Sequence, residues 1–222
     1  MKIVKKNNFK FYYRANTADD LQLNYNQNMF FIPEYNIEPN DIVIDIGSHI
    51  GTFAVPMAHR IPEGKIYAIE ARKETFDILR KNIVLNDLHN VSVHNIALTN
   101  FKGSTKLYYA PYNQNWGDSI TNISKESEIV KTNTLGKFMQ ENEIDHCNFM
   151  KINCEGAEFE IILSSSKKTL KKIKLLLILY HSDFNKNHSE KKLIDYLREC
   201  DFEVSVRNKS EKRGWIIAKN IK

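Results

Sequence analysis

The chain has 222 residues, of which 42% are hydrophobic and 27% charged, enough to build one sizeable core. Its 32 basic and 27 acidic residues leave a net charge of +5. The lysines are scattered rather than gathered into a basic stripe interleaved with aromatic residues, so the sequence does not indicate a nucleic-acid partner.

The N-terminal residues, the apolar runs and the cysteines indicate which compartment and which class of protein to expect. The first ten residues lack the apolar segment of a signal peptide, and the longest apolar run, Leu175 to Tyr180, is far too short to span a membrane. The three cysteines, Cys147, Cys154 and Cys200, have no C-x-x-C spacing, which argues against a disulfide framework or a zinc site. We expect a cytoplasmic protein without a membrane span.

No stretch is rich enough in Pro, Gly or Ser to divide the chain into separate folding units. We expect one main domain over residues 41–222 and an N-terminal extension over residues 1–40. Phe9, Phe11 and Tyr13 alternate as in a short strand, and residues 28–35 form an apolar patch. The extension is predicted to cover the cleft or an edge of the sheet; plain packing against the core is the alternative.

The segment from Asp41 to Gly51, D-I-V-I-D-I-G-S-H-I-G, predicts a strand, a glycine turn and a helix. Its apolar run is too short for a helix and suits a parallel strand that is covered on both faces. The helix is predicted over Thr52 to Arg60. Gly47 and Gly51 allow a tight turn and a close approach of ligand to backbone, where a helix N-terminus offers N–H groups.

The spacing of this turn distinguishes between nucleotide ligands. A dinucleotide fingerprint needs G-x-G-x-x-G, and here His49 occupies the place of the middle glycine. A bulky side chain disfavours a pyrophosphate and suits S-adenosylmethionine, which carries an amino-acid tail instead. An NAD-dependent oxidoreductase is the competing enzyme class.

The next strand, Lys65 to Glu70, ends in a carboxylate. An acidic side chain at this position of a nucleotide-binding sheet can accept two hydrogen bonds from a ribose diol, although a strand-end Glu can also be merely solvated. A covering helix is predicted over Lys73 to Asn86, and a third strand over Asn90 to Leu98. The end of that strand would lie near the adenine.

Successive parallel strands need helical crossovers, so these units predict an α/β fold with a doubly wound, mostly parallel sheet. Short strands at Phe202 to Val206 and Trp215 to Ala218 predict a closing antiparallel hairpin at the C-terminus. Ligands of such sheets bind beyond the carboxyl ends of the strands.

Between these units lie a short predicted strand at Lys106 to Ala110, a polar loop at Tyr112 to Ser119, and a helix at Thr134 to Asn142. The loop carries Trp116, which could stack on a substrate or simply anchor its own loop.

The segment Phe149 to Glu158, F-M-K-I-N-C-E-G-A-E, predicts a buried strand that turns into a helix at Gly156. Asn153 and Glu155 would then lie at the same sheet edge as Gly47 and Glu70. The strand Leu175 to Tyr180 would deliver His181 to that edge as well, followed by Ser182 and Asp183.

Together, D-I-G-S-H-I-G, K-I-Y-A-I-E, N-V-S-V-H-N-I-A-L, T-L-G-K-F-M and K-I-N-C-E-G-A-E resemble the FkbM family of S-adenosylmethionine-dependent methyltransferases, in order and spacing. The resemblance covers roughly Asp41 to Asp183, with E-G-A-E its most discriminating part. It implies a Rossmann-like class I methyltransferase fold, and methyl transfer to a sugar, glycan or small-molecule hydroxyl. Asn153 and Gly136 stand where the family usually has Asp, and Tyr180 where it commonly has an acidic residue. Asn153 cannot serve as a base.

These patterns assign residues to roles. For the cofactor S-adenosylmethionine we expect Asp45, Gly47, Ser48, His49, Gly51, Glu70, Ala71, Asn95 and Ala97; for catalysis His181, Glu155 and Asn153; for the substrate Trp116 and Ser119; and no metal.

His181 is the candidate general base, since the pKa of histidine suits proton transfer near neutral pH. A strand-end histidine bonded to backbone is the alternative. A metal site built from Glu155, Glu158, His181 and Asp183 would lack local ligand spacing. Asn153 also leaves open a binding module that has kept the cofactor fold and lost the chemistry.

Overall fold

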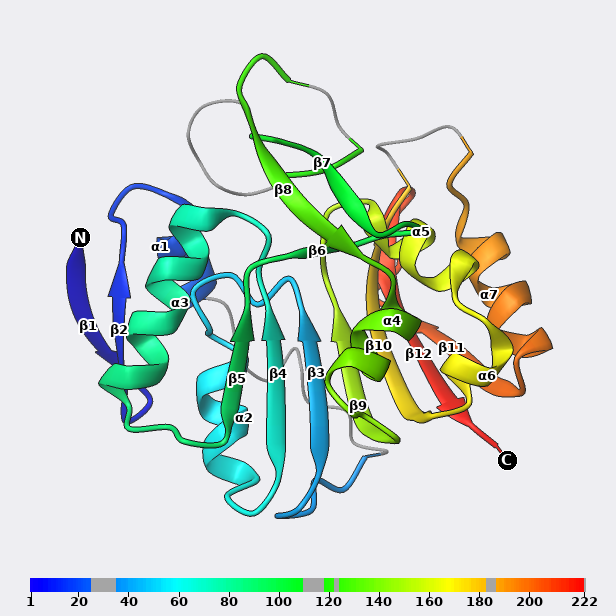
Figure 1. Ribbon diagram of the computed structural model, residues 1–222, viewed down its shortest axis with the longest axis horizontal. Helices are drawn as coiled ribbons and strands as arrows, with labels where there is room; N and C mark the ends of the chain where they lie inside the picture. The colour runs from blue at the N-terminus through cyan, green and yellow to red at the C-terminus, as the bar shows by residue number, and fades with distance from the viewer. Residues whose placement is uncertain (25–34, 110–117, 122–123, 183–186, 222) are drawn as a thin grey trace.

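The computed structural model describes residues 1–24, 35–109, 118–121, 124–182 and 187–221. Within these residues the chain forms a seven-stranded sheet, a three-stranded sheet and a two-stranded hairpin (Figure 1). The seven-stranded sheet carries the main core and positions the site.

The central sheet has the strand order β11-β12-β10-β9-β3-β4-β5. Five neighbouring strands, β10, β9, β3, β4 and β5, pair in parallel, whereas β12 is antiparallel to both β10 and β11. The predicted doubly wound sheet with a C-terminal antiparallel hairpin is therefore confirmed. The strands are β3 (Ile42–Ile46), β4 (Lys65–Ile69), β5 (Val91–His94), β9 (Cys147–Ile152), β10 (Ile173–His181), β11 (Phe202–Arg207) and β12 (Arg213–Asn220).

Helices cover both faces of this sheet, which explains why its inner strands are continuous apolar runs. In β3, Ile44 packs with the cluster beneath α4, α5 and α7, while Val43 packs with the cluster beneath α2 and α3. The bounds are α2 (Ala54–Arg60), α3 (Lys73–Leu85), α4 (Leu135–Glu141), α5 (Ala157–Ser164), α6 (Lys167–Leu170) and α7 (Glu190–Glu199).

The strand predicted over Asn90 to Leu98 is in fact two strands, because the chain leaves the central sheet after His94. Asn95 donates its side-chain amide to the carbonyls of Glu70 and Ala71 at 3.0 and 2.8 Å. The chain then enters the three-stranded sheet, ordered β6-β8-β7. Its strands are β6 (Ala97–Leu98), β7 (Gly103–Tyr108) and β8 (Ser127–Asn133), and β7 and β8 project above the carboxyl edge of the central sheet (Figure 1).

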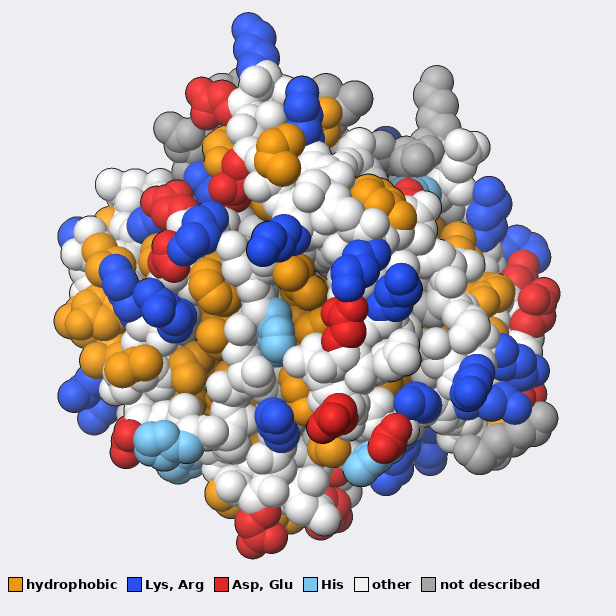
Figure 2. All heavy atoms as spheres, in the orientation of Figure 1, with side chains coloured by type: hydrophobic (Ala, Val, Ile, Leu, Met, Phe, Trp, Pro, Cys, Tyr) orange, Lys and Arg blue, Asp and Glu red, His pale blue; other side chains and the backbone are white. Residues whose placement is uncertain are grey.

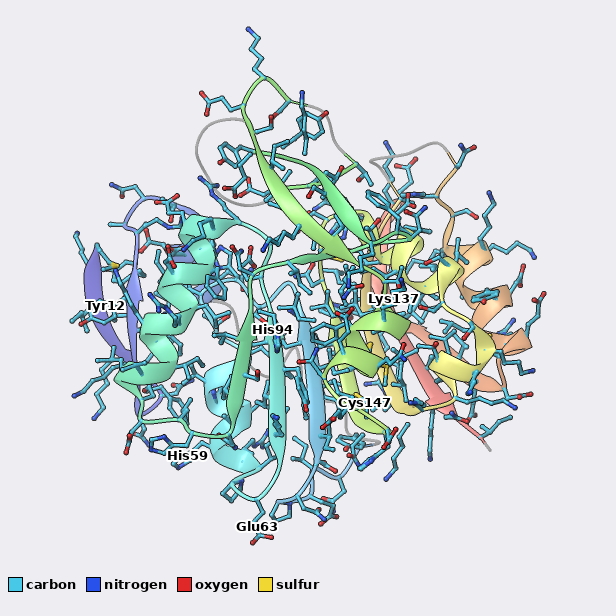
Figure 3. The ribbon with its side chains drawn as sticks, viewed as in Figure 1. Tyr12, His59, Glu63, His94, Lys137 and Cys147 are labelled. Carbon is cyan, nitrogen blue, oxygen red and sulfur yellow. The ribbon has the colours of Figure 1, made fainter. Side chains whose placement is uncertain are left out.

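The N-terminal residues form a hairpin, β1 (Lys2–Lys6) and β2 (Phe9–Tyr13), followed by α1 (Ala18–Asn24). The hairpin packs on α3, where Figure 3 labels Tyr12. Asn82 of α3 accepts from the Tyr12 N–H and donates to its carbonyl, at 2.6 and 3.1 Å. The hairpin therefore covers a helix, whereas two residues of α1 reach the pocket described below. The predicted boundary at residue 40 stays a prediction, and residues 28–34 of the apolar patch lie outside the described part of the chain.

Among the described residues, no helix combines the length and the apolar character that crossing a membrane requires.

Candidate functional site

A pocket opens at the carboxyl edge of the central sheet, beyond the ends of β3, β4, β5 and β9. One part of its wall is apolar and consists of Ile69, Ile96, Ala97, Leu98, Leu107 and Ile120. The polar part consists of Gln22, His49, Glu70, Thr75, Asp118, Asn153 and Glu155. Residues from α1, from the central sheet and from the small sheet thus meet around one space.

Gly47 lines this pocket, and its glycine character is required by packing against the protein. It has a left-handed φ of 76°, and a Cβ added there would lie 1.8 Å from the carbonyl oxygen of Asn153. The N–H groups of Gly47 and Ser48 both donate to the Ile69 carbonyl, at 3.0 and 2.9 Å. The turn is therefore locked against the ends of β4 and β9.

Three residues predicted to contact the cofactor support the turn from beneath instead. Asp45 is fully buried and lies 2.8 Å from the Nζ atom of Lys151, which also donates to the Gly47 carbonyl. Ser48 is buried and donates its hydroxyl to the Asp45 carbonyl at 2.8 Å. A Cβ on Gly51 would lie 2.9 Å from a methyl carbon of Leu79. None of the three is among the residues that line the pocket, and their contact with the cofactor stays a prediction.

Glu70 lies where the sequence predicts, at the end of β4 on the pocket wall. Its carboxylate accepts the N–H groups of His49 and Arg72, each at 2.9 Å. Burial raises the pKa of Glu70 to about 7, against the opposing effect of these two hydrogen bonds. Ala71 also lines the pocket, as does Ala97, whereas Asn95 acts through the backbone of the β4–α3 turn.

His49 connects the glycine turn to the N-terminal segment. Its backbone is left-handed with a φ of 52°, and its Nε2 atom lies 3.4 Å from the Oδ1 atom of the buried Asp19 in α1. Arg14 also pairs with Asp19, at 2.9 Å. Burial lowers the pKa of His49 to about 4. The imidazole is therefore neutral at pH 7, and it presents a polar, uncharged surface to the pocket.

The turn between β9 and α5 supplies the other polar wall. Glu155 and Gly156 both have left-handed backbone, with φ values of 53° and 103°. The side-chain oxygen of Asn153 is buried without a hydrogen-bond partner among the described residues. Because a buried polar atom without a partner costs free energy, this oxygen marks a place where a ligand donor fits.

Glu158 secures this turn from inside the protein. Its fully buried carboxylate accepts the N–H of Cys154 through Oε1 at 2.9 Å and the N–H of Gly156 through Oε2 at 2.8 Å. From the sequence, Glu158 is considered only as a metal ligand. The signal for this capping role is its place two residues after Gly156, where an acidic side chain can reach the free N–H groups of a helix start.

His181 is 1% exposed and lies behind Glu155, which differs from the predicted position facing a substrate. Its Nδ1 atom lies 3.0 Å from Oε1 of Glu158, and its Nε2 atom lies 3.4 Å from Oε2 of Glu155. Burial disfavours the charged imidazole, but the two carboxylates outweigh burial and raise the pKa of His181. Of these three ionisable side chains, Glu155 is the one that lines the pocket.

Of the two predicted substrate residues, Ser119 is described by the structure and is not among the residues that line the pocket. Ser119 is 1% exposed and donates its hydroxyl to the Glu155 carbonyl at 2.6 Å, so it holds the β9–α5 turn from the side of the small sheet. Trp116 lies outside the described residues. Its neighbour Asp118 does line the pocket and is paired with Arg72 at 2.6 Å, a contact that no local sequence signal indicated.

The described residues contain no group of three or more His, Cys, Asp or Glu side chains arranged to hold a metal ion. Asp183, the fourth member of the metal site considered from sequence, lies outside them.

The pocket fits S-adenosylmethionine by the chemistry of its walls. The apolar wall suits an adenine ring, and Glu70 offers a carboxylate for ribose hydroxyls. The unpartnered Asn153 oxygen can accept from an ammonium group, close to the glycine turn. The sheet order and this site together define a class I methyltransferase.

Comparison with known proteins gives the family. The family model described as "Methyltransferase FkbM domain" matches residues 45–204, so the chain belongs to the FkbM methyltransferases, whose cofactor is S-adenosylmethionine. The "Methyltransferase 1" of Beauveria bassiana is 25% identical over 72% of this chain and 74% of its own length. The "Hexuronic acid methyltransferase AglP" of Haloferax volcanii is 25% identical over 77% of this chain and 72% of its own length.

A solved structure also matches the fold. The crystal structure of methyltransferase FkbM from Methylobacillus flagellatus KT superposes with a TM-score of 0.55 at 14% identity, covering 86% of this chain and 47% of that one. The resemblance to the FkbM family stated from the sequence is therefore confirmed, and an NAD-dependent oxidoreductase is not supported.

Proposed function

We propose that this methyltransferase acts on the oxygen of a hydroxyl group, carried by a sugar, a glycan or another small molecule. The observation that carries the proposal is the position of Glu155, a carboxylate on the pocket wall that is backed by a buried His181 and Glu158. A hydroxyl must lose a proton when it is methylated, and a carboxylate at the pocket wall can accept it.

The cofactor would be held along the sheet edge. We place adenine on the wall formed by Ile96, Ala97 and Leu107, and the ribose hydroxyls on Glu70. The amino-acid tail would then meet the backbone near Gly47 and the side chain of Asn153. This order follows the strand order β5, β4, β3, β9 and brings the reactive end of the cofactor next to Glu155.

When bound, S-adenosylmethionine would supply an electrophilic methyl group and would leave as S-adenosylhomocysteine after transfer to the acceptor oxygen. The chain's own residues would position the acceptor hydroxyl, and Glu155 would take its proton. Ser119 holds the Glu155 backbone through its carbonyl, which fixes the place from which the carboxylate acts.

His181 is then a positioning residue. Its Nδ1 atom lies 3.0 Å from Oε1 of Glu158 and its Nε2 atom 3.4 Å from Oε2 of Glu155, so the ring would orient the Glu155 carboxylate without touching the acceptor. This replaces the direct proton transfer to His181 that the sequence suggests. Asn153, which lacks a titratable group, binds rather than reacts.

Two observations are consistent with a small-molecule or glycan hydroxyl as the acceptor. One relative is named a hexuronic acid methyltransferase. On the face seen in Figure 2, Lys and Arg side chains are dispersed and interleaved with acidic ones, whereas a nucleic-acid-binding surface usually gathers them. A binding module without chemistry is the alternative, and Glu155 argues against it because a buried network supports a residue that cofactor binding alone does not require.

The test is a panel of sugars, glycans and small alcohols, each incubated with the protein and S-adenosylmethionine. We expect formation of S-adenosylhomocysteine and, by NMR of the product, a methyl group on oxygen. A product methylated only on nitrogen or carbon would contradict O-methylation. Tight binding of S-adenosylmethionine with no turnover across the panel and across cell-extract metabolites would favour the binding module.

A further inference from the structure

We infer that the acceptor is an electrically neutral hydroxyl compound, and that the pocket rejects acceptors carrying a carboxylate or a phosphate. The inference deepens the proposed function and rests on it. It separates this chain from its relative named for hexuronic acid, because a hexuronate is an anion at neutral pH.

The charged side chains that line the pocket are acidic. Among the described residues, the lining includes Glu70, Asp118 and Glu155, of which Asp118 pairs with Arg72, and it contains no Lys or Arg. The three undescribed stretches that flank lining residues in sequence, 25–34 after Gln22, 110–117 before Asp118 and 122–123 after Ile120, also contain no Lys or Arg. An anion brought into this space finds no cation of the described wall to pair with.

The basic residues near the pocket are engaged elsewhere. Arg14 pairs with Asp19, Arg72 with Asp118 and Lys151 with Asp45, at distances of 2.9, 2.6 and 2.8 Å. Asp45 and Asp19 are fully buried, so withdrawing Lys151 or Arg14 would leave a buried carboxylate uncompensated. Lys151 and Arg14 therefore stay with their own partners when an acceptor binds.

The polar groups that remain suit hydroxyls. Gln22 and Asn153 carry amides, and the His49 imidazole is neutral, so each can donate to or accept from an alcohol. Glu155 accepts only, which matches an O–H donor and repels a second anion. A sulfonium bound beside Glu155 adds one positive charge, and that carboxylate already balances it.

The first experiment works before any acceptor has been identified. Small molecules and glycans from cell extracts are separated by anion exchange into a neutral and a retained fraction, and each is incubated with the protein and S-adenosylmethionine labelled in its methyl group. We expect the label in the neutral fraction. Label found mainly in the retained fraction would overturn the inference and leave methyl transfer to oxygen standing.

Absence of label from both fractions, in a protein shown by calorimetry to bind S-adenosylmethionine, would instead contradict the proposed transfer itself. The two failures are therefore distinguishable.

The second experiment changes the charge. Matched pairs such as an alkyl hexoside and the corresponding hexuronide differ by a carboxylate alone, and we expect the hexoside to be preferred by about tenfold or more. Gln22→Arg places a cation on the wall and should reduce that preference. Leu21→Arg adds the same charge next to it on a side chain that is 50% exposed, and should leave the preference unchanged. An equal response of both variants, or a parental preference for the hexuronide, would contradict the inference.

Discussion

Two turns at the carboxyl edge of the sheet look alike in sequence, since each leads from a buried strand through glycine into a helix. In the β3–α2 turn the backbone N–H groups are used within the protein, because Gly47 and Ser48 both donate to the Ile69 carbonyl. Asp45 is likewise paired with Lys151 inside the protein. In the β9–α5 turn the side chains of Asn153 and Glu155 face the pocket, and a buried network fixes them from behind. The first turn forms part of the pocket wall, whereas the second turn supplies the residues that we propose to take part in the reaction.

The comparison explains why the more familiar motif is less informative about mechanism. A glycine turn can be required entirely by packing, as the 1.8 Å approach of a Gly47 Cβ to Asn153 illustrates. In the second turn, the position of Glu155 at the pocket wall and beside His181 supports a role in the reaction.

The largest effect is expected in the second turn. Glu155→Gln removes the carboxylate that accepts the hydroxyl proton while keeping its size, so turnover of a verified acceptor should fall about 10²–10⁴-fold. The dissociation constant for S-adenosylmethionine, measured by calorimetry, should change little. Glu160→Gln is the control, since Glu160 lies in α5, the helix that follows the turn, and its carboxylate lies 3.6 Å from His188. Equal turnover in the parent and Glu155→Gln would remove Glu155 from the reaction.

The first turn should respond in stability rather than in chemistry. Gly47→Ala forces a methyl group against the Asn153 carbonyl at a left-handed φ, which should lower the free energy of unfolding by about 3 kcal/mol or more. Gly103→Ala is the matched control, because its Cβ would meet Phe101 at an ordinary 3.5 Å. Urea unfolding of both variants decides the matter. A Gly47→Ala protein as stable as the control would mean that the turn can relax at little cost.

Glu70 is proposed to bind the ribose of S-adenosylmethionine, so its loss should weaken cofactor binding without a direct effect on proton transfer. Glu70→Gln should weaken S-adenosylmethionine binding by about 1.5–3 kcal/mol, the contribution of hydrogen bonds to a charged acceptor. In the parent, affinity should also decline as pH falls below about 7, because protonation of Glu70 removes acceptor capacity for the ribose hydroxyls. Calorimetry between about pH 6 and 8, on either side of that pKa, measures both effects, and a pH-independent affinity would place the ribose elsewhere.

The smallest effect concerns the protonation of His181. Its pKa is raised in the folded state, so its contribution to stability is fully present below the unfolded value of about 6.5 and is lost as pH rises through the folded pKa. His181→Asn should flatten the decline of unfolding free energy on that alkaline side. If the parent protein instead lost this contribution to its free energy of unfolding on acidification, His181 would be neutral in the folded state.

The sequence predicts much of the central sheet because its strands are locally distinctive. Apolar runs such as Ile42 to Ile46 and Leu175 to Tyr180 are buried on both faces, so composition alone indicates them. The strand β8 was missed because its residues are mostly polar and its Ile129 is 68% exposed. Its pairing with β6 and β7 is not encoded in a local pattern.

The candidate site, like the fold, is only partly predictable from the sequence. The edge position of Glu70 and Glu155 follows from topology, which strand prediction supplies. The burial of His181 between Glu158 and Glu155 depends on how β10 packs against α5, and no spacing within the sequence reports that contact. Which member of an ionisable group faces the pocket is therefore a tertiary property.

The coupling between Glu155 and His181 tests the division between the two turns most directly. Turnover is measured for Glu155→Gln, for His181→Asn and for the double variant. His181→Asn keeps a donor toward Glu158 and removes the one toward Glu155. Because His181 acts through Glu155, the turnover of the double variant should be within about twofold of that of Glu155→Gln. His181→Gln restores a donor on the Glu155 side, so it should recover part of the activity lost in His181→Asn. If the two losses multiply and His181→Gln recovers nothing, His181 acts independently of Glu155 and the account is contradicted.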